Sequence, residues 1–528
     1  MARSVVIVGG GTAGWMTASY LRAAFGDRIS VTVVESKNVS TIGVGEATFS
    51  TIRHFFNYLG LDEQTWMPEC DATYKLAIRY ENWRRTGHHF YHPFERTRLI
   101  EGFPMTDWWL QLKPSERFDL DCYTIPALCD AFKSPRYLDG KLFELDFQES
   151  RDEPMYRTAP TDQNTQFPYA YHFDATLLAA YLCQYATDRG AHQILDDVVH
   201  IAQDERGWIE ALHTKEHGEI RGDLYIDCTG FRGLLLNQTL GVEFLSYQET
   251  LPNDRAVALR VPLDMAAKGI RPCTTATAMD AGWIWTIPLF GRIGTGYVYA
   301  GDYCTPDEAE TALRAFVGPA ADDLEANHIR MRIGRSREHW VGNCVAIGLS
   351  SGFVEPLEST GIFFIQHGIE QLVKHFPSHG FDETVRASYN RLVNHVMDGV
   401  REFLVLHYYA AARVDNQYWK DTKTRPLPDG LAQRVEMWQT RPPDSETIWP
   451  YNHGFEPYSW VAMLLGLGGL PTKPSSGLSL IDATAAKAEL DSVRRQTRML
   501  LERLPSQYEY FAHLRREVKD PTPAPAKA

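Results

Sequence analysis

Short apolar runs separated by glycine-rich turns dominate the first two thirds of the chain. Ser4–Val8 (SVVIV) is a continuous β-branched run, which is typical of a strand covered on both faces. A helix fits Trp15–Phe25, and Ile29–Glu35 (ISVTVVE) has the pattern of a second buried strand. The first 35 residues therefore predict one β-α-β unit.

Further apolar runs predict more strands, and the last third of the chain becomes helical. The additional strands are expected at Asp223–Asp227, Trp283–Pro288 and Asn343–Ile347. Helices are expected at Ile362–Phe376, 382–409 and, as a long charged amphipathic segment, Ala485–Leu504. We find no internal repeat. The order of elements predicts an α/β protein with a mostly helical C-terminal part.

The composition narrows the class of protein. Of 528 residues, 44% are hydrophobic and 23% are charged, which excludes a disordered chain, a fibre and a small disulfide scaffold. The net charge of −14 and the lack of a Lys/Arg cluster argue against nucleic-acid binding. No apolar run of 18 residues and no signal-peptide pattern is present, so we expect a cytoplasmic protein without membrane contact. The eight cysteines lack CxxC spacing, which predicts reduced thiols and no metal site.

A glycine motif follows the first strand directly. Gly9-x-Gly11-x-x-Gly14 stands between a strand and a helix, and Glu35 ends the next strand, as in dinucleotide-binding units. A pyrophosphate would lie at the helix N-terminus, and Glu35 would accept hydrogen bonds from the adenosine ribose. A glycine-rich turn without ligand is the alternative. A second strand end at Asp227–Gly230 and a single GxGxxG motif favour FAD and give no separate site for NAD(P)H.

Three further segments carry a family resemblance. They are 43–48 (GVGEAT), Trp283–Pro288 (WIWTIP) and Gly352–Ile362 (GFVEPLESTGI). Together with the initial GGGTAGWM, they resemble the flavin-dependent tryptophan halogenases from Val5 to about Trp460. The resemblance implies an FAD module of the flavin monooxygenase (GR2-like) kind over 1–378, with inserted substrate-side segments. A helical part over 379–519 would complete the substrate pocket, and 520–528 would be a disordered tail.

The resemblance also implies a reaction. Reduced FAD and oxygen would form a flavin C4a-hydroperoxide, a halide would attack it, and the resulting hypohalous acid would pass through a tunnel to an aromatic substrate. FADH2 would come from a separate flavin reductase, and a homodimer is possible. The FAD contacts that the motifs and the resemblance imply are Gly9, Gly11, Thr12, Ala13, Gly14, Glu35, Gly45, Glu46, Val198, Asp227, Gly230, Leu349 and Ile362.

Two residues match the catalytic pair of the family. Lys75 would hold hypohalous acid by a hydrogen bond or carry the halogen as a haloamine. Its alternative is a solvated surface lysine, since it lies in an alternating stretch, YKLAIRYE. Glu358 would stabilise the cationic arene and take its proton. Its alternative is an acid that only favours the following helix N-terminus.

Other matched residues would shape the two chambers. The backbone N–H groups of Thr360 and Gly361 would hold the halide, and Ser359 would lie between the chambers. Trp283 and Trp285 share one face of a strand, so they would wall off the flavin or be ordinary core. The aromatic sandwich around the substrate would consist of His92, Phe94 and Trp460, with an ordinary loop histidine as the alternative for His92.

One family feature is out of register. Family members that are specific for free tryptophan clamp its charged groups with a Tyr-Tyr pair and a Glu shortly before the residue that matches Trp460. At the corresponding positions this chain has Ile448, Trp449 and Phe455. Tyr451, Glu456 and Tyr458 lie nearby but out of register. This spacing predicts a preference for an indole-type ring over free tryptophan. The spacing does not determine the halide; bromide, which is oxidised more easily, is expected, with chloride as the other candidate. The alternatives are an FAD-dependent aromatic hydroxylase and a non-catalytic flavin-binding relative.

Overall fold

The computed structural model describes residues 2–39, 45–144, 169–377, 380–448 and 454–519. Strand β1 (Ser4–Val8) lies between β2 (Ser30–Glu35) and β14 (Leu224–Asp227) and is parallel to both. The predicted β-α-β unit is therefore confirmed. Helix α1 (Thr12–Phe25) begins three residues earlier than predicted, because Gly11 is already its N-cap and the end of the glycine motif belongs to the helix.

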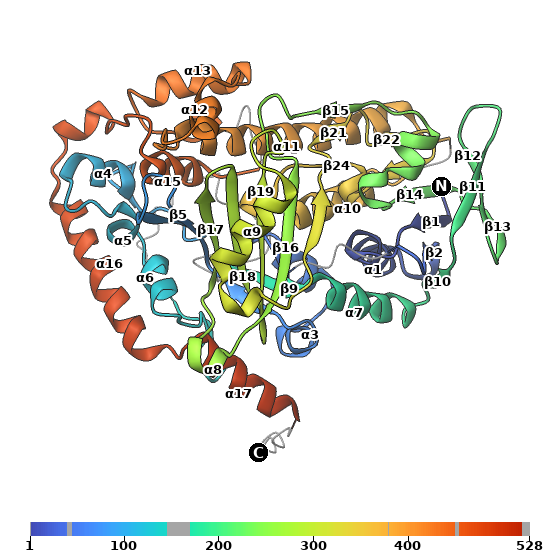
Figure 1. The fold of residues 1–528 in the computed structure, drawn as a ribbon, viewed down its shortest axis with the longest axis horizontal. Helices are drawn as coiled ribbons and strands as arrows, with labels where there is room; N and C mark the ends of the chain where they lie inside the picture. The colour runs from blue at the N-terminus through green and yellow to red at the C-terminus, as the bar shows by residue number, and fades with distance from the viewer. Residues whose placement is uncertain (1, 40–44, 145–168, 378–379, 449–453, 520–528) are drawn as a thin grey trace.

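The α/β class is confirmed by two large sheets. The first has the strand order β10-β2-β1-β14-β23-β22, with β10 (His192–Leu195), β23 (Cys344–Ala346) and β22 (Trp340–Val341). The second has the order β20-β16-β19-β18-β17-β5-β6. Its strands are β20 (Asn327–Arg330), β16 (Arg255–Pro262), β19 (Arg292–Tyr299), β18 (Gly282–Pro288), β17 (Cys273–Met279), β5 (Ala77–Glu81) and β6 (His89–Pro93). In Figure 1 the first sheet lies on the right, and the second occupies the centre.

Smaller sheets connect these layers. They are β11 (Val198–Gln203) with β12 (Ile209–Thr214) and β13 (Gly218–Ile220); β15 (Phe244–Ser246) with β21 (Gly334–Ser336) and β24 (Gly352–Phe353); β3 (Gly45–Ala47) with β9 (Ala170–Asp174) and β4 (Thr73–Lys75); and β7 (Leu99–Ile100) with β8 (Phe103–Pro104). Strand β9 pairs with both β3 and β4, so it joins two segments that carry predicted site residues.

The predicted long helices are confirmed within two residues at each end. They are α10 (Gly361–Lys374), α11 (Glu383–Ala410) and α16 (Thr484–Arg503). Helix α10 packs against both α1 and α11, and α11 crosses the upper side of the molecule in Figure 1. Buried positions such as Val393, Val400 and Phe403 form the apolar face of α11.

The remaining helices cover the sheets and the site. They are α2 (Ile52–Leu59), α3 (Glu63–Glu69), α4 (Met105–Leu112), α5 (Phe118–Cys122), α6 (Ile125–Asp130), α7 (Ala175–Thr187), α8 (Met265–Lys268), α9 (Pro306–Val317), α12 (Gln417–Thr424), α13 (Asp429–Trp438), α14 (Ser445–Ile448), α15 (Pro457–Leu467) and α17 (Gln507–Lys519). Helix α15 packs against β6, and α17 packs against α3 and β4. The C-terminal helices therefore support strands from the first hundred residues.

The chemical state of the cysteines agrees with the sequence. All eight lie within the described ranges and are free thiols; Cys183 and Cys304 are partly exposed and the others are buried. In the described part of the chain, no helix combines the length and apolar character that a membrane span requires. The predicted tail, 520–528, and the domain boundary at 378/379 lie outside the described residues.

Candidate active site

A cavity of about 630 Å³ lies beyond the carboxyl ends of β1, β2 and β14. This is where parallel α/β sheets bind nucleotides. Most of the predicted FAD contacts line it, namely Gly9, Gly11, Thr12, Ala13, Glu35, Gly45, Glu46, Val198, Gly230, Leu349 and Ile362. Gly14 and Asp227 do not line the cavity. Gly14 lies against the backbone of Gly9, and Asp227 accepts hydrogen bonds from the backbone of the loop that follows β14.

Close backbone approach explains the glycine motif. A Cβ at Gly9 would lie 2.2 Å from the Cys228 carbonyl oxygen, and one at Gly14 would lie 1.9 Å from the Gly9 carbonyl oxygen. No side chain among the described residues caps the N-terminus of α1 at Gly11. Unpaired N–H groups in a tight, glycine-lined turn fit a pyrophosphate, so the residues present fit FAD.

Polar residues hold the loops around this cavity. The buried Asp227 carboxylate accepts hydrogen bonds from the backbone N–H groups of Thr229 (3.0 Å), Leu235 (2.8 Å) and Leu236 (2.9 Å), which fixes the loop after β14. Burial and the charge of nearby Asp174 raise the pKa of Glu46, which lines the cavity, to about 7.

Lys75 is fully buried at the end of β4, so the surface-lysine alternative is wrong. Its Nζ donates to the Thr48 carbonyl oxygen (2.9 Å) and to Ser359 Oγ (2.9 Å), and lies 5.1 Å from the centre of the Phe94 ring. Burial lowers the pKa of Lys75 to about 7, although the Glu358 carboxylate opposes this shift. An ammonium has three donors, so one is left to hold an oxidant.

Glu358 is fully buried at the end of the short turn Pro356–Glu358. His92 Nδ1 lies 3.1 Å from both carboxylate oxygens, His407 Nε2 lies 2.9 Å from Oε1, and the Tyr80 hydroxyl also donates to Oε1. Burial alone would raise the pKa of Glu358, but the attraction of His92 and the hydrogen bonds from both histidines hold it well below its usual range. The carboxylate therefore serves a buried network rather than only a helix end.

Sequence reasoning missed Tyr80 and His407. Tyr80 lies in the same alternating stretch as Lys75, and His407 is a polar residue within the apolar end of α11. A buried histidine in an apolar helix end is the available signal, but the sequence does not show which carboxylate it contacts.

The N-terminus of α10 faces the cavity next to these residues. Gly361 and Ser359 line the cavity, and Thr360 is the N-cap. The buried Thr360 Oγ1 has no hydrogen-bond partner among the described residues. Ser359 has a φ of 61°, an uncommon conformation for serine that turns the chain sharply into the helix. Unpaired N–H donors and an unpaired hydroxyl in one place suit a small anion.

Comparison with known proteins agrees with this arrangement. The model of the tryptophan halogenase family matches residues 4–483. The chain is 65% identical to the 7-chloro-L-tryptophan 6-halogenase KtzR of Kutzneria sp. (strain 744), over 97% of this chain and 99% of that protein. The crystal structure of the tryptophan 6-halogenase SttH from Streptomyces toxytricini superposes with a TM-score of 0.93 at 63% identity, covering 97% and 99% of the two chains.

A third similar protein has a solved structure. Tar14, a tryptophan C-6 flavin-dependent halogenase (chlorinase) from taromycin biosynthesis, superposes with a TM-score of 0.93 at 62% identity, covering 97% of this chain and all of that one. The chain belongs to the tryptophan halogenase family. It is a flavin-dependent oxidoreductase that uses FADH2 and a halide and acts on a small aromatic substrate.

The two tryptophans of the WIWTIP segment have different surroundings in this halogenase. Trp285 lines the cavity, whereas Trp283 does not. Trp283 Nε1 donates to Oε2 of the buried Glu355 (3.1 Å), and the two indole rings lie 6.4 Å apart, edge to face. Trp285 is therefore placed to form the wall of the cavity, and Trp283 anchors the strand behind it.

Aromatic rings fill the space between the predicted substrate residues of the halogenase. His92 lies 6.0 Å from Phe403 and 6.4 Å from Phe455, and Trp460 lies 4.8 Å from Phe403 (ring centres). Phe403 and Phe455 are themselves 4.0 Å apart. The structure thus brings His92 and Trp460 to one aromatic cluster, and Phe403 is a member that sequence reasoning missed.

The predicted clamp positions are only partly described. Ile448 and Phe455 are buried apolar residues, and Trp449 and Tyr451 lie outside the described residues. Glu456, which follows Phe455, forms an ion pair with Arg96. Its Oε1 accepts a hydrogen bond from the Arg96 guanidinium at 3.1 Å, and the two side chains are about one third exposed (29% and 32%).

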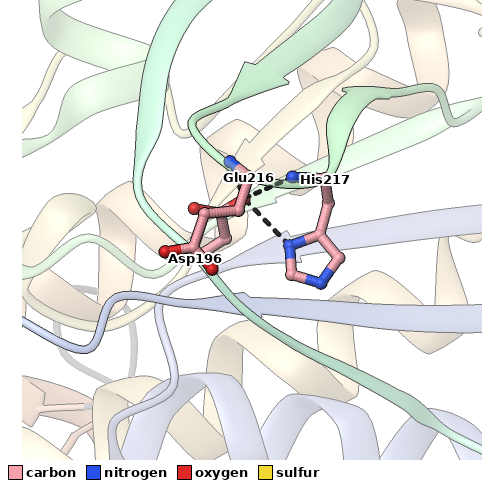
Figure 2. Close-up of side chains that lie close together, drawn as sticks. All are labelled: Asp196, Glu216 and His217. Carbon is pink, nitrogen blue, oxygen red and sulfur yellow. Dashed lines mark hydrogen bonds and ion pairs between the residues drawn. The ribbon is translucent and has the colours of Figure 1, made fainter.

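One cluster of metal-ligating residue types occurs among the described residues. Asp196, Glu216 and His217 lie together at the edge of the cavity-forming sheet (Figure 2). Asp196 Oδ2 accepts hydrogen bonds from the backbone N–H groups of Glu216 (2.8 Å) and His217 (2.8 Å) and lies 3.0 Å from His217 Nδ1. We interpret this cluster as a hydrogen-bonded turn.

Proposed function

We propose that this enzyme chlorinates L-tryptophan at C6. The observation that carries the proposal is the hydrogen bond between Lys75 Nζ and Ser359 Oγ, because Ser359 lines the FAD-type cavity while Lys75 is anchored beside Glu358 and Phe94. An oxidant leaving the cavity past Ser359 would meet Lys75 next. The choice of ring position follows the relatives named tryptophan 6-halogenases, and Tar14, which is named a chlorinase, supports chloride.

Each residue has a defined task in this proposal. Bound FADH2 with oxygen supplies the oxidising equivalent that converts the halide to hypohalous acid. The N–H groups of Thr360 and Gly361 bind the halide, and Trp285 keeps the organic substrate out of the cavity. Ser359 lies between the cavity and Lys75, with its hydroxyl hydrogen-bonded to the lysine. The Lys75 ammonium holds the oxidant by a hydrogen bond, and the Glu358 carboxylate stabilises the cationic ring and accepts its proton.

The amino-acid part of the substrate needs charged partners. A buried zwitterion without them loses several kcal/mol of solvation, at least about 3. Arg96 and Glu456 form an ion pair that is about one third exposed, and Tyr458, two residues after Glu456, has its ring 6.3 Å from that of His92. We infer that this pair opens to hold the carboxylate and the ammonium of tryptophan. This explains how a chain with Ile448 and Phe455 at the clamp positions still selects the amino acid.

A competition experiment tests the substrate. Equal concentrations of L-tryptophan and indole are incubated with the enzyme, FAD, a generic flavin reductase, NADH and chloride, and the products are analysed by mass spectrometry and NMR. We expect 6-chlorotryptophan as the main product. Predominant haloindole would support the prediction that the register of the clamp favours indole, and would refute the tryptophan proposal. A hydroxylated product formed without halide would refute halogenation altogether.

Three further expectations belong to this proposal. A separate flavin reductase supplies FADH2 by diffusion, since the sequence has a single GxGxxG motif, and its first two glycines line the FAD-type cavity. Cytoplasmic location and a homodimer are the accompanying proposals. Replacing the reductase by chemically reduced FAD should sustain single turnovers, and gel filtration with light scattering measures the oligomeric state.

A further inference from the structure

Glu358 has two oxygens in different surroundings. Within the described part of the chain, Oε1 has hydrogen-bond contacts with Tyr80, His407 and His92, whereas Oε2 has one with His92 alone. A carboxylate oxygen with three donors has little capacity left to accept a proton. The asymmetry therefore leaves Oε2 as the basic atom.

The ring of His407 has a defined proton arrangement. Its Nδ1 lies 2.7 Å from the Phe403 carbonyl oxygen, which can only accept, so Nδ1 carries a hydrogen. Its Nε2 faces the carboxylate at 2.9 Å and the Tyr80 hydroxyl at 3.1 Å. A bare Nε2 would place a lone pair against a carboxylate. Nε2 therefore also carries a hydrogen, which is donated to Oε1.

We propose that His407, assisted by Tyr80, is a positioning residue that occupies Oε1 of Glu358 and thereby makes Oε2 the base that deprotonates the halogenated ring. In that step the C–H bond of the substituted carbon breaks, its electron pair returns to the aromatic system, and its proton forms an O–H bond with Oε2. His407 and Tyr80 contact neither substrate nor cofactor in this scheme. The inference rests on the proposed function for its catalytic readout.

The charged and titratable groups around Glu358 come from four elements. They are Lys75 on β4, Tyr80 on β5, His92 on β6 and His407 on α11. Glu355, on the same loop as Glu358, lies near enough to Tyr80 for its negative charge to help raise the pKa of the Tyr80 hydroxyl. The two histidines and Tyr80 hydrogen-bond the carboxylate directly, so removing His407 should change Glu358 without reaching the Lys75 contacts with Thr48 and Ser359.

The variants separate a positioning role from a structural one. His407→Phe removes the donor, His407→Gln returns an amide N–H near Nε2, and Tyr80→Phe removes the hydroxyl. Tyr247→Phe is the matched control, because the Tyr247 hydroxyl donates to Asp398 on the same helix (2.6 Å) and does not touch Glu358. The reference is the wild-type enzyme with FAD, reductase, chloride and tryptophan.

We expect His407→Phe to lower kcat for chlorination by about 10- to 100-fold, with KM nearly unchanged. This is less than the roughly 10²–10⁴-fold of a lost acid–base group, because Glu358 itself remains. His407→Gln should recover part of this loss, and Tyr247→Phe should match the wild type. Hypochlorous acid trapped by a scavenger dye should be undiminished in all variants. Tryptophan deuterated on its benzo ring should show a primary isotope effect in His407→Phe that is absent in the wild type, since deprotonation has become slow.

A second measurement does not depend on the substrate. In ¹⁵N-histidine NMR of the FAD-loaded enzyme, assigned with His407→Gln, we expect a hydrogen on Nε2 of His407 that is donated to the Glu358 carboxylate, as the 2.9 Å contact assigns. Glu358→Gln removes the charged acceptor, so the resonance of His407 Nε2 should shift, while that of Nδ1, which faces the Phe403 carbonyl oxygen, should stay. A wild-type His407 whose Nε2 donates no hydrogen to Glu358, or unchanged kcat and no isotope effect in His407→Phe, would overturn the inference. A wild-type enzyme that does not halogenate tryptophan would refute the proposed function, while the NMR result would still decide the arrangement at Glu358.

Discussion

Lys75 is a charged residue without solvent contact, and its environment follows from two hydrogen bonds. Thr48 and Ser359 each accept from Nζ at 2.9 Å. We expect Lys75→Met to lower the rate of tryptophan chlorination by at least about 100-fold, because an aliphatic chain cannot hold hypohalous acid. FAD binding and the peroxide-forming oxidation of FADH2 should persist, which flavin fluorescence and a peroxide assay measure. A variant that retains more than a tenth of the wild-type rate would contradict this role.

The lowered pKa of Lys75 predicts how the stability of the protein depends on pH. Burial lowers it from 10.5 to about 7 in the folded protein. Between these values the unfolded chain binds more protons than the folded one, so the contribution of Lys75 to stability rises with pH through this window and is most unfavourable below pH 7. Lys75→Met removes this term. The free energy of unfolding of Lys75→Met minus that of the wild type should therefore fall by roughly 2 kcal/mol between pH 7 and pH 9. Urea denaturation at both pH values measures this difference. An unchanged difference would show that Lys75 titrates near its ordinary value.

At the scale of elements, the end of α11 anchors the catalytic loop at two points. His407 contacts Glu358, and the adjacent Tyr408 donates to Oε2 of Glu355 at 2.7 Å. The same Oε2 accepts from Asn253 (2.8 Å) and Trp283 (3.1 Å), which ties the WIWTIP strand to the loop. Burial raises the pKa of Glu355, which favours the neutral acid.

A pair of substitutions at Glu355 tests this anchor. Glu355→Gln keeps an oxygen for the three donors, so we expect stability within about 1 kcal/mol of wild type. Glu355→Leu leaves the donors buried and unpaired, which should destabilise the protein by about 2–5 kcal/mol. Denaturant unfolding monitored by tryptophan fluorescence measures both variants. Equal stability of the two would show that the contacts with Trp283, Asn253 and Tyr408 contribute little.

At the scale of the whole molecule, one cavity joins segments that are far apart in the sequence. Its lining runs from Val8 in β1 to Ile365 in α10 and includes Trp285 from the central sheet. A ligand that fills it therefore contacts several layers and binds the folded state alone.

FAD should consequently stabilise the entire chain. At a free concentration of 100 times Kd, mass action adds about 2.7 kcal/mol to the free energy of unfolding. We expect the midpoint of thermal unfolding to rise with FAD concentration in the wild type and equally in Lys75→Met, because Lys75 does not line the cavity. Scanning fluorimetry with and without FAD measures the shift. Loss of the shift in Lys75→Met would show that this residue supports FAD binding.

Local patterns were sufficient for the nucleotide unit and the long helices. The β-branched run Ser4–Val8 and the glycine spacing after it determine β1, the turn and α1 through contacts close in sequence, and the apolar periodicity of α11 gives its length. Lys75 and Glu358 were found through motifs, but the alternating pattern around Lys75 is the same for a half-exposed strand as for a buried one. Its burial follows from the pairing of β4 with β9, nearly a hundred residues away.

The network around Glu358 required the folded chain. Tyr80 is 278 residues from Glu358 and His407 is 49 residues from it, and they meet because β5 belongs to the central sheet while α11 packs over the loop. The aromatic neighbours Phe403 and Phe455 come together for the same reason. Residue types and short spacings determine which groups have catalytic chemistry, whereas the distances and proton arrangement that give them distinct tasks depend on contacts between distant segments.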